Sequence, residues 1–400
     1  MAMRILLVME ELQCGGAELS FFSLCRALSE RSEVHLALSQ QSLLNPTIRA
    51  LHDSLSDTSV SIHRCETPLN PGTISNLHPL LRRAAAGQLA AVLESVRPEV
   101  VIVNLPTVER GQAVLDAAEM CRPRPPVWGF LHLSQTPSVI GAKLGPVRDL
   151  LVPKLIRRFD RLLTVSQAGA REVVQRYGTE SPSVVHPPTQ TLVPFPAGLD
   201  RSSLREAEGL PNGFLLGMVG RVQIHHKGHD AALRVTRKLL GQGHALHLLV
   251  IGDGPDLQTV RAMANRMGIR SAVTFLGWRN DIDRLMPLLD AVLMPSRYEG
   301  LPLVAVQAVT AHVPVVGYGV GGLAELLPGP FTVPYGAEAG LVAAVESLLW
   351  NPKQWPAEEV RLRAVTWCEP RNAADRVLAL LSLAFHEHAQ STEEVLPGKQ

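Results

Sequence analysis

Short runs of apolar residues alternate with amphipathic stretches along almost the whole chain. In the first half, the runs that predict buried strands are Ile5–Val8, Val34–Leu38, Val60–Ile62, Val100–Val103, Val127–Leu131 and Leu162–Val165. Stretches with helical spacing lie between them, such as Ala17–Ser29, Gln88–Val96 and Arg110–Met120. Continuous Val, Ile and Leu runs are typical of parallel strands covered on both faces, so the alternation predicts right-handed βαβ units.

This pattern stops at His186–Ser203, where prolines at 187, 188, 194 and 196 favour a linker over a strand or helix. It resumes with the expected strands Phe214–Val219, Leu246–Ile251, Val273–Leu276, Ala291–Met294 and Val313–Val316. The sequence therefore predicts two doubly wound α/β domains, residues 1–195 and 205–369. A last helical pattern, Arg371–His386, either belongs to the second domain or crosses back to the first.

The composition of the chain is that of an ordinary globular protein. The chain has 400 residues, 46% hydrophobic and 19% charged, with a formal net charge of +1, so nothing global suggests a nucleic-acid partner. Five scattered cysteines without CxxC spacing favour reduced thiols over disulfides or a zinc site. No apolar run approaches the roughly 20 residues that span a bilayer, and the first is too short for a signal peptide. We therefore expect a cytoplasmic protein.

Candidate chemistry lies in loops that follow strands, because open parallel sheets bind ligands there. Gly15 and Gly16 precede a helix, where backbone can approach a ligand, although an ordinary βα turn also uses glycine. Arg221 and Lys227, in "GRVQIHHKGHD", suit a diphosphate or form a solvated basic loop. The histidines of that loop lack a nearby carboxylate or cysteine, so we predict no metal site.

Two further loops add polar groups. His132 follows the fifth expected strand and is either a ligand-facing group or a structural histidine. In "RYEGLPLVAVQA", Glu299 precedes a Gly-Leu-Pro turn, and the N–H groups of Gly300, Leu301 and Leu303 would open a helix with Pro302 in its first turn. Gln307 lies about 7 Å further along that helix. The glycine-rich segment Gly317–Leu327 suggests a second anion nest.

The second half resembles the family 4 retaining glycosyltransferases of the GT-B fold. The resemblance rests on "GRVQIHHKGHD", "LVIGDGPD", "VTFLGW", "AVLMPSRYEGLPLVAVQAV" and "PVVGYGVGGLAEL", in that order. The first half matches more weakly through "CGGAELSFFSLCRALSE", "FLH" and "FDRLLTVSQAGARE". The family implies a nucleotide-sugar donor domain facing an acceptor domain, with the last helix, 370–388, crossing back to the first.

The resemblance also implies roles for the site residues. Arg221, Lys227 and the Gly300–Leu303 amides, including the turn at Pro302, would hold the donor diphosphate. Glu299 would contact the donor sugar and His132 the transferred sugar. Gly15 and Gly16 would flank the donor phosphate, and Leu276 the nucleobase.

Two positions depart from the family pattern. Gln307 stands where the family usually has a second glutamate, the proposed ribose ligand, and this bears on nucleotide affinity more than on catalysis. Leu133 stands after His132, where an aspartate is common.

The predicted reaction is retaining transfer of a sugar, with a UDP-sugar as the expected donor, to an unidentified hydroxyl acceptor: a glycan, a lipid-linked sugar or a small molecule. Neither a further cofactor nor a metal is expected. A nucleotide-sugar 2-epimerase and a non-catalytic sugar-nucleotide binder remain alternatives, whereas the missing GxGxxG argues against an NAD-linked dehydrogenase.

A side hypothesis concerns membranes. The segment "GPVRDLLVPKLIRRFDRLL" carries Arg148, Lys154, Arg157, Arg158 and Arg161 near apolar residues. It is either a helix that docks on anionic lipid at the inner face of the membrane or a solvated basic face.

Overall fold

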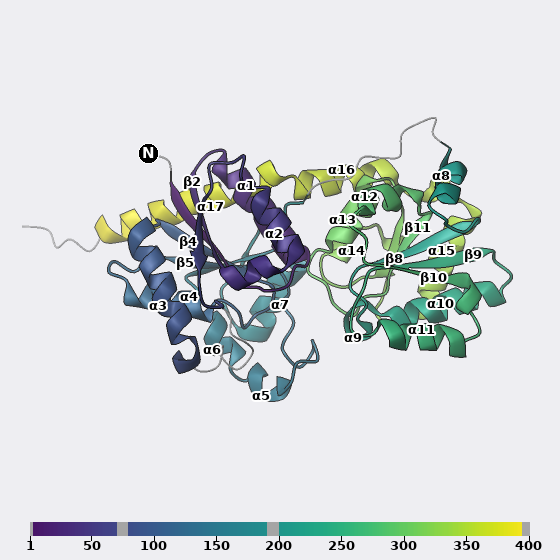
Figure 1. The fold of residues 1–400 in the computed structure, drawn as a ribbon, viewed down its shortest axis with the longest axis horizontal. Coiled ribbons are helices and arrows are strands. Elements are labelled where there is room, and N and C mark those ends of the chain that lie inside the picture. Colours follow the sequence, from purple (N-terminus) through teal and green to yellow (C-terminus); the bar gives the residue numbers. More distant parts are fainter. Residues whose placement is uncertain (1–2, 70–78, 190–199, 394–400) are drawn as a thin grey trace, which may run out of the picture.

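The computed structural model describes residues 3–69, 79–189 and 200–393. Within them, two parallel sheets, each flanked by helices, form two domains that lie side by side (Figure 1). The expected pair of doubly wound α/β domains is therefore confirmed.

The first domain has the strand order β3-β2-β1-β4-β5-β6-β7. Its strands are β1 (Arg4–Met9), β2 (Glu33–Ser39), β3 (Ser61–Cys65), β4 (Val100–Leu105), β5 (Val127–Leu131), β6 (Arg161–Thr164) and β7 (Ser183–Val184). Its helices are α1 (Gly16–Ser29), α2 (Pro46–Asp53), α3 (Pro79–Val96), α4 (Gln112–Met120), α5 (Gly145–Asp149), α6 (Val152–Ile156) and α7 (Gln167–Tyr177). All six expected strands are present. The third, expected at Val60–Ile62, extends further along the chain as β3, and β7 is a strand that the sequence did not predict.

The second domain has the strand order β10-β9-β8-β11-β12-β13. Its strands are β8 (Phe214–Val219), β9 (Leu246–Ile251), β10 (Val273–Gly277), β11 (Ala291–Met294), β12 (Val315–Tyr318) and β13 (Thr332–Val333). The helices are α8 (Arg201–Ala207), α9 (Ile224–Lys227), α10 (His229–Gly241), α11 (Leu257–Arg266), α12 (Ile282–Leu285), α13 (Leu303–Thr310), α14 (Leu323–Leu326), α15 (Glu338–Trp350), α16 (Ala357–Cys368) and α17 (Pro370–Glu393).

The apolar runs of the central strands are continuous because these strands are buried on both faces. Along β1, Ile5 and Leu7 pack into one hydrophobic cluster, whereas Leu6 and Val8 pack into the cluster on the opposite face of the sheet. Alternate side chains of a strand point to opposite faces, so both must be apolar when helices cover both.

The expected linker, His186–Ser203, falls largely on residues 190–199, outside the described residues. Its C-terminal end was placed too far along the chain, because α8 already begins at Arg201, capped by the side chain of Asp200. At its N-terminal end, the Thr189 N–H donates to the carbonyl oxygen of Cys368, which is the last residue of α16.

Helix α17 crosses back onto the first domain, as expected, and lies along α1 (Figure 1). Val377 and Leu381 are buried in this contact region. Ion pairs join Arg31 to Asp375 and, at 3.4 Å, Arg371 to Glu30. None of the described helices combines the length and the hydropathy that a membrane span requires.

Candidate functional site

Loops from the carboxyl ends of both sheets meet between the domains. A Cβ placed on Gly300, after β11, would lie 2.1 Å from the backbone oxygen of His132, after β5. A Cβ on Gly16, at the start of α1, would lie 3.5 Å from the side chain of Leu303, at the start of α13. The structure therefore brings these predicted site residues of the two domains close together.

Glu299 lies beside this contact and is 6% exposed. The Lys227 ammonium donates to its Oε1 at 2.7 Å, and His226 Nε2 lies 4.0 Å from its Oε2. Burial alone would raise the pKa of Glu299, but the charge of Lys227 and a hydrogen bond from Ser296 outweigh it and hold the pKa below its usual value. Glu299 is therefore an ionised, acceptor-only group at neutral pH.

The loop that carries Lys227 is fixed by backbone contacts. Gly228 ends α9 with φ of 72°, and a Cβ there would lie 2.0 Å from the carbonyl oxygen of Pro295. The N–H of Val222 donates to the oxygen of Asp253, while the Asp256 carboxylate accepts from the N–H of Ile224. The "GDGP" turn therefore supports this loop by packing against it.

Arg221 differs from Lys227 in its surroundings. Its guanidinium is exposed and contacts the first domain through a 3.2 Å hydrogen bond to Gln13 Oε1. Leu276 lies on β10, half-buried, with the exposed Trp278 two residues later. Arg221 and Leu276 thus belong to the second domain but do not touch the Lys227–Glu299 pair.

Helix α13 offers free amides at its start. It begins at Leu303, with Pro302 as its N-cap instead of inside its first turn as expected. No carbonyl oxygen in the described part of the chain accepts the N–H of Leu301, Leu303 or Val304. Gln307 is half-buried on the same helix. A helix start with unused amides favours an anion.

His132 is held so that one ring nitrogen remains available. Its backbone N–H donates to the oxygen of Leu105, and its ring lies 4.7 Å from that of Phe130. Burial lowers the pKa of His132 to about 3, and Nε2 has no hydrogen-bond partner. A neutral imidazole of this kind can hydrogen-bond a ligand but does not hold a proton at neutral pH.

The glycine-rich segment after β12 is not an anion nest. The N–H of Gly319 donates to the oxygen of Val333, that of Val320 to Tyr318, and that of Gly322 to Gly300 at 2.5 Å. These amides are therefore used within the backbone. The prediction of a second nest is wrong, because the glycines serve close packing against the loop that carries Glu299.

The three histidines near α9 have separate surroundings. His225 Nε2 contacts the backbone oxygen of Val139 at 2.8 Å, His226 stacks on Tyr298 at 4.2 Å, and His229 is buried. Among the described residues, no group of three His, Cys, Asp or Glu is arranged to hold a metal ion.

The structure adds residues that the sequence pattern did not indicate. Gln13 contacts Arg221, and Ser296 donates a hydrogen bond to Glu299, three residues later in the chain. Only the fold reveals the contact of Gln13, because its partner lies 208 residues away in the chain.

Two family models match the chain: the "Glycosyl transferase 4-like domain" over residues 15–189 and "Glycosyl transferases group 1" over residues 213–351. The 2-deoxystreptamine glucosyltransferase of Streptomyces kanamyceticus is 34% identical over 182 residues, 41% of this chain and 46% of that protein. The D-inositol 3-phosphate glycosyltransferase of Mycobacterium tuberculosis is 32% identical over 216 residues, 51% of this chain and 42% of that protein. Each match thus spans less than half of the relative's own length.

Solved structures share the fold over nearly the whole chain. HepE of Anabaena, solved with UDP, has a TM-score of 0.74 at 20% identity, covering 95% of this chain and 100% of that one. Sucrose-phosphate synthase from Thermosynechococcus elongatus has a TM-score of 0.76 at 15% identity, covering 96% and 100%. At such identities the likeness establishes the fold alone.

The Lys227–Glu299 pair can be tested through stability. Lys227→Met leaves a buried carboxylate without its cation, so we expect a loss of about 3 kcal/mol at neutral pH, measured by thermal unfolding. In the wild type, the lowered pKa of Glu299 gives stability that is lost as the pH falls through that pKa. In Lys227→Met burial raises the pKa, so the deficit should shrink as the pH falls toward about 5.

Glu299→Gln added to Lys227→Met removes the unpaired charge and should recover most of the loss. Strictly additive effects of the two substitutions would contradict the pairing.

Proposed function

The chain belongs to the family 4 glycosyltransferases of the GT-B fold, and we propose that it transfers a sugar from a nucleotide-diphosphate donor to a hydroxyl acceptor. The observation that carries this proposal is the Lys227–Glu299 pair beside the free amides of α13, in contact with the His132 loop. It places a cation, an ionised carboxylate and amide donors together between the two domains.

In this proposal the second domain holds the donor. Lys227, Arg221 and the α13 amides neutralise the diphosphate, and Glu299 accepts hydrogen bonds from sugar hydroxyls. The proposed donor-binding residues are Gly15, Gly16, Arg221, Lys227, Gly300, Leu301, Pro302, Leu303, Gln307 and Leu276. UDP is the nucleotide that we propose first for the donor, since the similar HepE was solved with UDP.

We propose that the anomeric configuration is retained through attack on the face from which the diphosphate leaves. The bond from the anomeric carbon to the diphosphate oxygen breaks, and its electron pair leaves with that oxygen. The acceptor hydroxyl forms the new bond and gives its proton to the departing diphosphate. A neutral His132 supports this route, because it can orient the sugar without competing for the proton.

Binding and turnover test the proposal together. We expect UDP to bind more tightly than GDP, ADP or dTDP in calorimetry. Glu299→Ala should reduce sugar transfer at least about a hundredfold while UDP affinity changes less than about threefold, because the carboxylate contacts the sugar and not the nucleotide. Glu206→Ala, an exposed carboxylate on α8, serves as the matched control.

The outcomes separate the alternatives. No nucleotide binding at millimolar concentration would refute the transferase. Binding without transfer or donor hydrolysis would favour a non-catalytic binder, and inversion of the sugar without an acceptor would favour an epimerase.

Gln307 permits a second prediction. Its side chain is half-buried and forms no hydrogen bond among the described residues. A carboxylate would accept from both ribose hydroxyls with the added strength of an ionised acceptor. Gln307→Glu should therefore tighten UDP binding several-fold, with turnover at saturating donor unchanged. A tenfold change in that turnover would place Gln307 in the chemistry itself.

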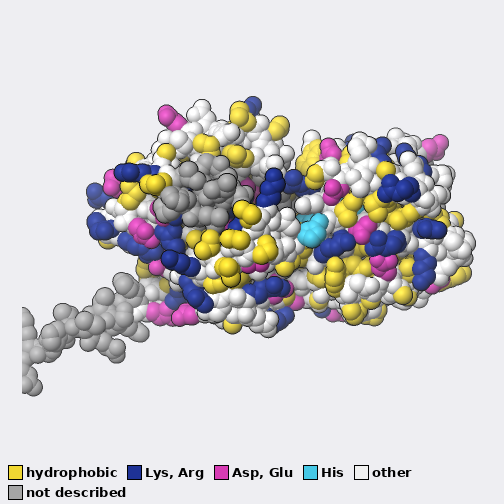
Figure 2. Space-filling view, turned by 90° about the horizontal axis from the view of Figure 1, so that it is seen from below, with side chains coloured by type: hydrophobic (Ala, Val, Ile, Leu, Met, Phe, Trp, Pro, Cys, Tyr) yellow, Lys and Arg dark blue, Asp and Glu magenta, His cyan; other side chains and the backbone are white. Residues whose placement is uncertain are grey.

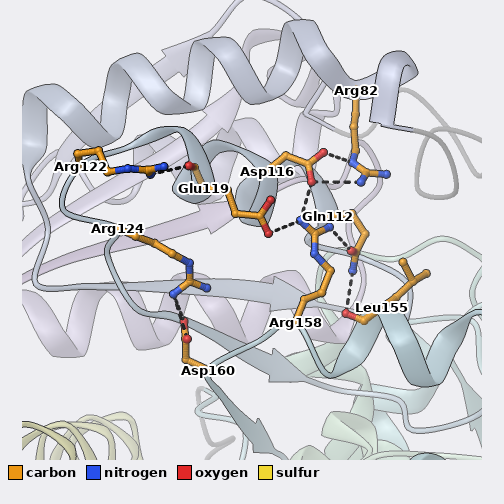
Figure 3. Close-up of polar contacts among 9 residues, drawn as sticks. All are labelled: Arg82, Gln112, Asp116, Glu119, Arg122, Arg124, Leu155, Arg158 and Asp160. Atoms are coloured by element: carbon orange, nitrogen blue, oxygen red, sulfur yellow. Dashed lines mark hydrogen bonds and ion pairs between the residues drawn. The ribbon is translucent and has the colours of Figure 1, made fainter. Parts of the chain in front are cut away.

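The basic segment, residues 145–163, does not form one continuous helix. It folds as the short helices α5 and α6, and most of its cations contact the protein. Arg148 pairs with Glu109 in the interior. Figure 3 shows Arg158 paired with Asp116 and Glu119. Arg161 also pairs with Glu387, and Arg157 donates to the oxygen of Tyr177. Neither a lipid-docking basic helix nor a fully solvated basic face describes the segment.

Apolar side chains on the same segment support a different membrane contact. Leu144, Val147 and Leu150, here called the α5 patch, are 71%, 58% and 80% exposed. Figure 2 shows hydrophobic side chains gathered on this face of the first domain, with Lys and Arg around them. We propose that the α5 patch docks peripherally on the anionic inner face of the membrane.

Vesicle flotation tests this contact. The protein should float with vesicles that contain anionic lipid, and Leu144→Glu with Leu150→Glu should abolish flotation because two charges replace apolar area. Leu362→Glu, at a residue 64% exposed on α16, is the control and should still float. Failure of the wild type to float would remove the proposal.

A further inference from the structure

A carboxylate of the second domain caps a helix of the first. Glu325, on α14, accepts hydrogen bonds from the backbone N–H groups of Gln167 at 3.1 Å and Ala168 at 2.5 Å. These are the first two residues of α7. The N-cap residue, Ser166, uses its own hydroxyl oxygen for the third N–H, that of Gly169, at 3.1 Å. Amides that a helix start normally leaves to water are thus satisfied from the other domain.

The electrostatics favour this contact. The Glu325 side chain is 17% exposed, and a carboxylate at a helix N-terminus is stabilised by the helix dipole as well as by the hydrogen bonds. Arg171, one turn into α7, lies 3.9 Å from the same carboxylate. The contact is therefore charge-assisted and largely shielded, unlike the exposed interdomain bond from Arg221 to Gln13.

The same segment leads directly to the site. Gly322, three residues before Glu325, would place a Cβ 2.9 Å from the Cβ of Ser166, so only glycine lets the two domains approach this closely. The N–H of Gly322 donates to the oxygen of Gly300, whose α-carbon faces the backbone of His132. Contacts thus run without interruption from α7 through Glu325 to the loop that carries Glu299.

We propose that Glu325 is a positioning residue that holds the two domains closed by capping α7, and thereby sets the position of Glu299 relative to His132. The proposal rests on the proposed function for its effect on turnover, but its effect on domain closure does not. Glu325 touches neither donor nor acceptor in this scheme. The chemical step requires groups from both domains in the correct relative position, whereas the nucleotide binds mainly to the second domain. Loss of the cap should therefore lower turnover more than nucleotide affinity.

Two substitutions test the contact from opposite sides. Glu325→Ala removes the acceptor, and we expect turnover to fall about tenfold or more with UDP affinity nearly unchanged. Gln167→Pro removes one of the two N–H donors and should give a smaller fall. Proline is favoured at the first position of a helix, and Ser166 before it is extended, with φ of −156° and ψ of 159°, so α7 should remain intact.

Non-additivity is the decisive readout. In the Glu325→Ala background, Gln167→Pro should cost clearly less than it does alone, because its partner is already gone. Glu325→Gln, which keeps an acceptor oxygen, should restore part of the turnover. Gln167→Ala, which keeps the N–H, should behave as wild type, and so should Glu358→Ala, an exposed carboxylate on α16.

Small-angle scattering measures closure without reference to activity. The radius of gyration should increase in Glu325→Ala and remain unchanged in Glu358→Ala. Wild-type turnover and an unchanged radius in Glu325→Ala, or full additivity with Gln167→Pro, would overturn the proposal. A wild type that binds no nucleotide would instead refute the proposed function, while the scattering result would still decide whether Glu325 closes the domains.

Discussion

The ion pair between the Lys227 ammonium and the Glu299 carboxylate is the interaction on which the candidate site depends. A buried ion pair repays its desolvation only if its remaining hydrogen-bonding positions are filled, and here Ser296 fills one. The two residues come from loops after β8 and after β11, so their contact fixes the relative positions of those loops. It also keeps Glu299 ionised despite its burial. One contact thus sets both the geometry and the charge state of the site.

Glycines allow the surrounding loops to pack backbone against backbone. At four positions an added Cβ would lie 2.0 or 2.1 Å from a carbonyl oxygen of another loop. They are Gly228, Gly252, Gly300 and Gly321. Such approaches leave no room for a side chain, so the glycine-rich motifs of this chain build the frame of the site. The start of α13, in contrast, keeps the N–H groups of Leu301, Leu303 and Val304 without an acceptor among the described residues and so free for a bound anion.

The sequence could predict whatever depends on local pattern. Strands of four or more residues buried on both faces give an unmistakable apolar run, whereas β7 and β13 each have two residues and give none. Glu299, Lys227 and His132 could be identified as candidates because they lie in loops that follow strands, and in this fold class such loops lie together at one edge of the sheet.

Partners distant in the chain could not be predicted in the same way. The spacing of Arg148 and Arg158 is the same whether they face lipid or pair with carboxylates about forty residues earlier, as they do. A charge pattern along one segment contains no information about what the fold places opposite it. The Gly319 and Gly322 amides could not be predicted to be occupied for the same reason, since their carbonyl partners, Val333 and Gly300, lie elsewhere in the chain.

The charges around the proposed diphosphate site explain why an amide at position 307 is compatible with nucleotide binding. Lys227 already pairs with Glu299, so only part of its charge opposes a diphosphate, together with Arg221 and the α13 amides. A carboxylate at position 307 would add negative charge on the same helix, whereas the amide can accept from one ribose hydroxyl without doing so. Within the proposed function, the amide therefore gives up part of the ribose contact and avoids adding negative charge beside the diphosphate.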